Sequence, residues 1–79
     1  MQAPNVSNEE LKHDIYNTER EADAYYNISQ GFLVLSQLPE NSGHKEREYI
    51  QEYEKYKMHH KECENFINKL YEIKKERKL

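Results

Sequence analysis

The chain has little of what most sites and folds are built from. It contains one cysteine, two glycines, two prolines and no tryptophan, and its longest apolar run is the four residues from Phe32 to Leu35. One cysteine cannot form an intrachain disulfide, and this apolar run is far below the roughly 20 residues that a membrane-spanning helix needs. The sequence also has no glycine-rich phosphate-binding loop. These absences predict a soluble protein with no membrane partner and no nucleotide site.

The first ten residues, MQAPNVSNEE, have neither the basic nor the apolar region of a secretory signal, which favours a cytoplasmic location. Few turn formers stand beside 34% charged residues and seven tyrosines, a composition typical of packed helices. We therefore expect an all-α fold, with residues 1–79 as one domain. Low glycine and alanine with much lysine, asparagine, isoleucine and tyrosine favours an AT-rich genome, such as that of a low-GC bacterium or its phage.

A first helix is predicted over residues 8–38. Ser7 and Glu10 have the spacing of a capping box, and Val6 and Leu11 have that of a hydrophobic staple. Pro39 disfavours helical geometry in the residue before it and so ends the helix. One face of this helix is marked by alternating spacings of four and three residues, which join Leu11, Ile15, Thr18, Ala22, Tyr25, Ser29, Phe32 and Ser36.

A turn over residues 39–43 leads to a second helix over residues 44–77. Asn41 or Ser42 is expected to cap its start. A heptad pattern then runs along one face, with a drift towards Phe66 near the end, and comprises Tyr49, Tyr53, Tyr56, His60, Cys63, Ile67, Leu70 and Ile73.

The short turn makes the two helices antiparallel neighbours, a helical hairpin that pairs positions whose numbers add to roughly 82. In this register small residues face large ones, because Ala22 lies opposite His60 and Thr18 lies opposite Cys63. The net charges also differ in sign, with −5 over residues 1–43 and +2 over residues 44–79. A chain folded back on itself brings these opposite charges together.

A lone pair of helices buries too little to be very stable, so the hairpin is expected to have a partner. The segment 28–38 is apolar nearly all round, as in a helix of a multi-helix core. We expect a homodimer in which two hairpins form a four-helix bundle, or else a docking surface for a different protein. The expected contact residues are Tyr26, Ile28, Phe32, Leu33, Leu35 and Leu38.

The segment KMHHKEC, residues 57–63, is the one cluster of chemically reactive side chains. On a helix, His60 and Cys63 share a face and belong to the packing seam, where a histidine and a lone cysteine are commonly core residues. A dimer would allow two copies of the pair to form a zinc site of two histidines and two cysteines. No cofactor is expected otherwise, and no catalytic residue, because two thin helices form no cleft. We therefore predict a non-catalytic regulatory or adaptor protein.

Nucleic-acid binding is the alternative function. Lys74, Lys75, Arg77 and Lys78 gather at the C-terminal end of the second helix, where cations could contact phosphates. Glu72 and Glu76 interrupt this run. Basic residues also favour the C-terminal end of any helix because they complement its dipole, so a solvated helix end explains the same pattern.

Overall fold

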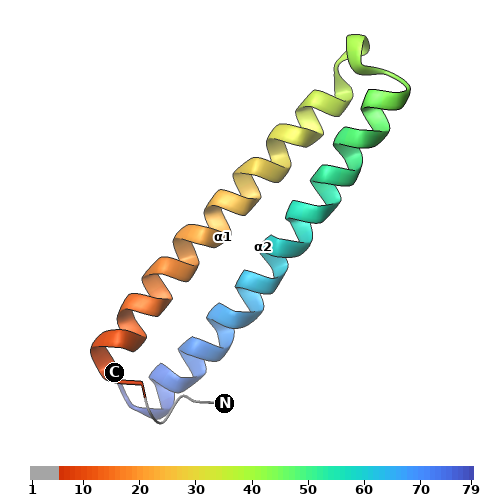
Figure 1. Ribbon diagram of the computed structural model, residues 1–79. Coiled ribbons are helices and arrows are strands. Elements are labelled where there is room, and N and C mark those ends of the chain that lie inside the picture. The colour runs from red at the N-terminus through yellow and green to blue at the C-terminus, as the bar shows by residue number, and fades with distance from the viewer. Residues whose placement is uncertain (1–5) are drawn as a thin grey trace.

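The protein is a hairpin of two long helices in a computed structural model that describes residues 6–79 (Figure 1). Helix α1 covers Asn8–Gln37, a short 3-10 helix η2 covers Pro39–Asn41, and helix α2 covers His44–Glu76. The expected all-α hairpin is thus confirmed, with helix ends within one residue of those predicted. Residues 1–5 lie outside the described residues. The sequence assigns them to the same domain, and they belong to the N-terminal segment that lacks the features of a secretory signal.

Helix α1 begins as the sequence predicts. The backbone N–H of Glu10 donates to Ser7 Oγ at 3.1 Å, and the backbone N–H of Ser7 donates to Glu10 Oε1 at 3.5 Å. Both halves of the capping box are therefore present. Val6 packs against a buried cluster that includes Leu11, as a hydrophobic staple requires.

The predicted cap of the second helix is wrong. The N-cap of α2 is Gly43, whose φ of 83° lies in the left-handed region that glycine adopts without steric cost. Asn41 has a different role, because its Nδ2 donates at 2.9 Å to the carbonyl oxygen of Leu35, which also accepts from the backbone N–H of Leu38 at 3.3 Å. The turn is thus organised around the end of the first helix.

The buried face of α1 is the predicted one. Leu11, Ile15, Thr18, Ala22, Ser29 and Ser36 are buried, and Tyr25 and Phe32 are half-buried. On α2 the heptad positions are half-buried, while Leu70 and Ile73 are fully buried. Phe66 was expected to join them but is 47% exposed. The contact face of α2 shifts around the helix only from Leu70 onward, one turn after Phe66.

Contacts across the hairpin confirm the register. His60 Nδ1 donates to the carbonyl oxygen of Ala22 at 3.0 Å, and the ring centroids of Tyr25 and Tyr56 are 6.1 Å apart. Nearer the termini, the Tyr71 hydroxyl donates to Glu19 Oε2 at 2.7 Å. Within α2, by contrast, His44, His59 and His60 each contact a glutamate three or four residues further along the same helix.

The two halves of the hairpin are packed differently. Near the termini, Leu11, Ile15, Leu70 and Ile73 form a buried apolar cluster. Near the turn, the helices are joined by half-buried rings, with Phe32 stacked between Tyr49 and Tyr56 at centroid distances of 6.0 and 5.8 Å. The half near the turn therefore lacks a fully buried large apolar side chain among the residues described.

Candidate functional site

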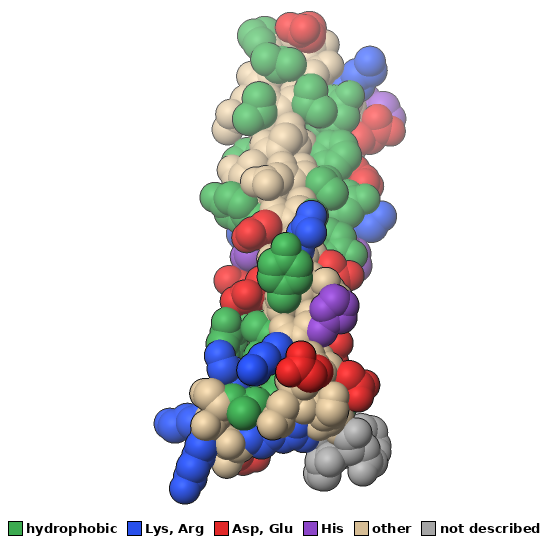
Figure 2. Space-filling model, turned by 90° about the vertical axis from the view of Figure 1, so that its left-hand side faces the viewer, with side chains coloured by type: hydrophobic (Ala, Val, Ile, Leu, Met, Phe, Trp, Pro, Cys, Tyr) green, Lys and Arg blue, Asp and Glu red, His purple; other side chains and the backbone are tan. Residues whose placement is uncertain are grey.

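The half of α1 nearest the turn carries no charge. Residues 24–39 contain no Asp, Glu, Lys or Arg, in a chain in which 34% of residues are charged. Within this segment Ile28, Val34 and Leu35 are 42%, 57% and 36% exposed. Figure 2 shows this side of the molecule, with hydrophobic side chains along its upper part and most acidic and basic ones below. A solvent-exposed helix rarely keeps such a surface without a partner to cover it.

The structure divides the predicted contact residues into three places. Ile28, Phe32 and Leu35 line one shallow apolar hollow, together with Gly31 and Val34.

Leu33 and Leu38 lie elsewhere, in a hollow between the end of α1, the turn and the start of α2. Tyr26 is separate again, because its ring packs on His60 with centroids 5.5 Å apart. Ile50, which lines the second hollow and is 39% exposed, was missed by sequence reasoning because it lies off the heptad seam of α2.

A second stripe of small and apolar residues runs along α1. Its members are separated by four, three and four residues and are Ala24, Ile28, Gly31 and Leu35. Each of them immediately precedes a core-facing residue, so the second stripe is turned by about 100° from the buried face. The sequence held this signal, because the same spacing rule that identifies the core also identifies the second stripe.

Gly31 has no role inside the hairpin that requires a glycine. A Cβ atom added there would meet nothing within 4 Å, yet glycine in a helix costs about 1 kcal/mol relative to alanine. Its conformation is helical, unlike that of Gly43. The missing side chain instead leaves a flat place in the exposed stripe, where a second helix can approach closely.

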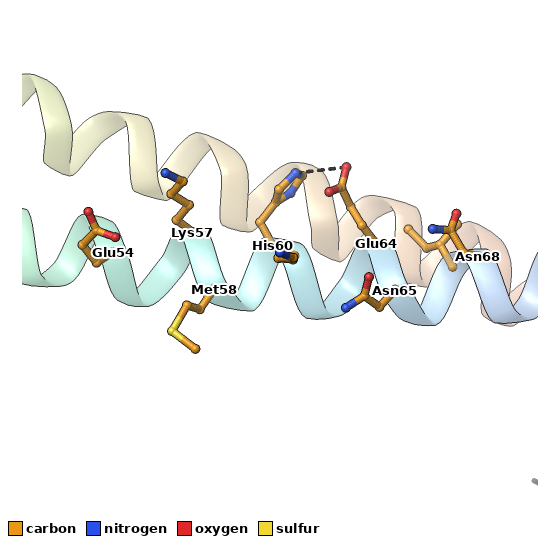
Figure 3. Close-up of a pocket in the computed structure, with 9 residues that line it drawn as sticks. Glu54, Lys57, Met58, His60, Glu64, Asn65 and Asn68 are labelled. Carbon is orange, nitrogen blue, oxygen red and sulfur yellow. Dashed lines mark ion pairs between the residues drawn. The ribbon is translucent and has the colours of Figure 1, made fainter.

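The histidines of KMHHKEC are engaged within the hairpin. His60 donates from Nδ1 to Ala22, and its Nε2 lies 3.3 Å from Glu64 Oε2, the contact drawn in Figure 3. His59 Nδ1 lies 3.4 Å from Glu62 Oε1. His60 also borders an open hollow on the outer side of α2, near Met58 and Asn65. Among residues 6–79 no three or more His, Cys, Asp or Glu side chains gather as a metal site would require.

Cys63 is a half-buried free thiol. Burial raises the pKa of this thiol, and the negative charges of Glu21 and Glu62 raise it further. The reactive form of cysteine is the thiolate, so a raised pKa reduces the fraction of Cys63 that can act as a nucleophile at neutral pH. This environment suits a packing residue better than a catalytic one.

The four basic residues of the alternative site do not all face solvent alike. Lys74 is half-buried, with its Nζ 5.6 Å from the centroid of the Tyr71 ring. Arg77 Nη1 donates to Asn8 Oδ1 at 3.1 Å, which ties the end of α2 to the start of α1. Lys75 and Lys78 are exposed. Two of the four side chains therefore already have contacts within the hairpin.

Neither helix of the described part is long and apolar enough to cross a bilayer. Comparisons with protein-family models, with curated proteins and with solved structures gave no match. The surface feature that stands out among the described residues is the uncharged, partly exposed apolar stripe on α1.

Proposed function

We propose that the chain is a small, non-catalytic protein-binding protein, regulatory or adaptor in role, that acts through the second stripe and the adjoining ring of Phe32. The observation that carries this proposal is the exposed, charge-free half of α1. Its apolar residues repeat with the helical spacing that a partner helix matches. A cytoplasmic location is part of the proposal and agrees with the free thiol of Cys63.

The partner arrangement that we propose is a homodimer in which two hairpins contribute to a four-helix bundle. Each helix of such a bundle touches two neighbours at roughly right angles to one another. Helix α1 has two faces of this kind, the buried face against α2 and the second stripe about 100° away from it. Closed twofold dimers are also the commonest oligomers.

Sedimentation velocity of the wild-type chain and of two variants tests this function. Leu35→Asp places a charge in the second stripe, whereas Met58→Asp places one on the outer side of α2, where Met58 is 66% exposed. We expect the wild type and Met58→Asp to sediment above the 9.6 kDa of one chain, and Leu35→Asp to sediment as a monomer with unchanged helicity. If Leu35→Asp associates as strongly as the wild type, the second stripe is not the binding surface.

Nucleic-acid binding has weaker support than protein binding. Its two exposed cations, Lys75 and Lys78, lie next to Glu76 in a chain of net charge −3, whereas phosphate affinity depends on many uncompensated cations. A gel shift at low salt that is lost when Lys74, Lys75, Arg77 and Lys78 are changed to glutamate would favour this alternative instead.

A further inference from the structure

The hairpin exposes more surface than a compact protein of its mass. Its accessible surface is 6119 Å², whereas a compact monomer of 9.6 kDa exposes about 5100 Å². The difference of about 1000 Å² is comparable to the roughly 800 Å² that each partner loses in an interface of standard size. A second copy of the chain offers an interface whose area is of this order.

Charge selects the direction in which a second copy can pack. Residues 8–23 of α1 carry six acidic and two basic side chains, while residues 24–39 carry none. Two parallel α1 helices would place both acidic halves side by side and make like charges neighbours. An antiparallel pair joined through the uncharged halves keeps the acidic halves at opposite ends. The uncharged half of α1 has no charged side chain that could pair with a charged surface on another protein. Its uncharged copy in a second chain is therefore the better match.

Side-chain size selects the register. Along the second stripe the residues run from Ala24 through Ile28 and Gly31 to Leu35. An antiparallel pair centred on Gly31 places Ile28 opposite Leu35 of the second copy and Gly31 opposite itself. The paired glycines leave space for the branched side chains beside them, as dense packing requires.

We infer that two copies of the chain pack antiparallel along their second stripes, with Gly31 at the twofold axis. This inference rests on the proposed function and specifies the partner of that surface. The isologous contact uses the same residues on both copies, as twofold symmetry demands. It also gives Gly31 the role that the hairpin alone does not provide.

The dimer that follows is staggered rather than fully overlapped. The turn lies about 15 Å from Gly31 along the helix axis, and one hairpin is 52 Å long. Only the halves near the turns overlap, so four helices run together there and two at each end, over a total of about 75 Å. A fully overlapped bundle would be close to the length of one hairpin.

The stagger also bears on the metal site expected between copies. His60 bonds to Ala22, which is nine residues from Gly31 and therefore about 14 Å from the axis. The two pairs of His60 and Cys63 then lie roughly 27 Å apart along the dimer. They cannot share one zinc ion in this arrangement, since zinc ligands lie within about 2.3 Å of the metal.

Disulfide trapping in the full-length chain tests the inference. In a Cys63→Ser background, Gly31→Cys places a thiol at the proposed axis, and Asn17→Cys places one on the same side of α1 within the acidic half. Fourteen residues separate the two positions, so the Asn17→Cys thiols lie about 42 Å apart in the antiparallel dimer and adjacent in a parallel one. The added side chain at position 31 weakens association, so the trapping is carried out at protein concentrations above the dissociation constant of the Gly31→Cys chain. Under these conditions we expect covalent dimers from Gly31→Cys and none from Asn17→Cys.

Small-angle X-ray scattering of the wild type provides the second measurement, with a maximum dimension of about 75 Å expected for the dimer. A dimer near the 52 Å length of one hairpin, or crosslinking through Asn17→Cys, would overturn the antiparallel arrangement and leave the proposed function standing. A wild-type dimer in which Gly31→Cys still associates at high concentration but does not crosslink would overturn the placement of the axis. A wild-type chain that stays monomeric would overturn both proposals.

Discussion

Changing Gly31 to alanine should affect folding and association in opposite directions. In the hairpin alone, the added methyl group meets no atom within 4 Å, and alanine favours the helix by about 1 kcal/mol over glycine. The monomer should therefore unfold at higher urea concentration. At the proposed twofold axis the same methyl group meets its own copy, and overpacking of a close contact typically costs about 1–3 kcal/mol. The dissociation constant should rise by about 5- to 150-fold.

Urea unfolding followed by circular dichroism at low protein concentration measures the first effect, and sedimentation equilibrium measures the second. Asn17→Ala is the matched control, because it also replaces a poor helix former on the same side of α1 but lies outside the proposed overlap. It should stabilise the monomer by about 0.5 kcal/mol and leave the dissociation constant unchanged. If Gly31→Ala stabilises the monomer and association together, close approach at Gly31 is not part of the interface.

Three further predictions concern the hairpin itself. Leu11 is 1% exposed, so Leu11→Ala should cost about 2–5 kcal/mol in the free energy of unfolding measured with urea; a cost below 1 kcal/mol would contradict the terminal core. The hydrogen bond to Glu19 raises the pKa of Tyr71, so its contribution to stability is present below the ordinary phenol pKa and is lost as pH rises through the folded value. In ultraviolet titration Glu19→Ala should move this late ionisation to lower pH. The raised pKa of Cys63 should make alkylation by iodoacetamide slower in the folded chain than in urea at the same pH, and equal rates would refute it.

Local patterns were sufficient to predict the helices and the face that each buries. The capping box at Ser7 and the spacing of buried residues on α1 depend on neighbours within one or two turns, which the sequence displays directly. The register also followed, because the short turn and the matching of small to large residues allow few alternatives. The confirmed contact between His60 and Ala22 reflects that constraint.

The details that sequence reasoning missed depend on competition between partners. Asn41 could cap α2 or bond to the end of α1, and its preference for the carbonyl of Leu35 is decided by the three-dimensional path of the turn. Phe66 has the spacing of the residues that face α1, but the contact face of α2 shifts around the helix only after this position. Phe66 therefore stays exposed. A position on a curved contact path cannot be assigned from spacing alone.

The sequence displays the apolar character of residues 28–38 but not how their side chains are distributed around the helix. Residues 28–38 do not form one patch, because a helix directs successive side chains around its axis. Leu33 and Leu38 therefore line a different hollow from Ile28 and Leu35. Gly31 and Ala24 contribute little apolar area, so apolar content alone does not show that they belong to a stripe. Their meaning emerges only when the second stripe is compared with the buried one.

We propose that a second copy of the chain completes the half of the hairpin near the turn. Amide hydrogen exchange at protein concentrations below and well above the dissociation constant tests it most directly, because exchange reports local opening segment by segment. We predict that the higher concentration slows exchange in residues 28–38 much more than in residues 11–22, where the terminal core is already complete. Slowing confined to residues 11–22, or exchange that does not depend on concentration, would contradict the claim.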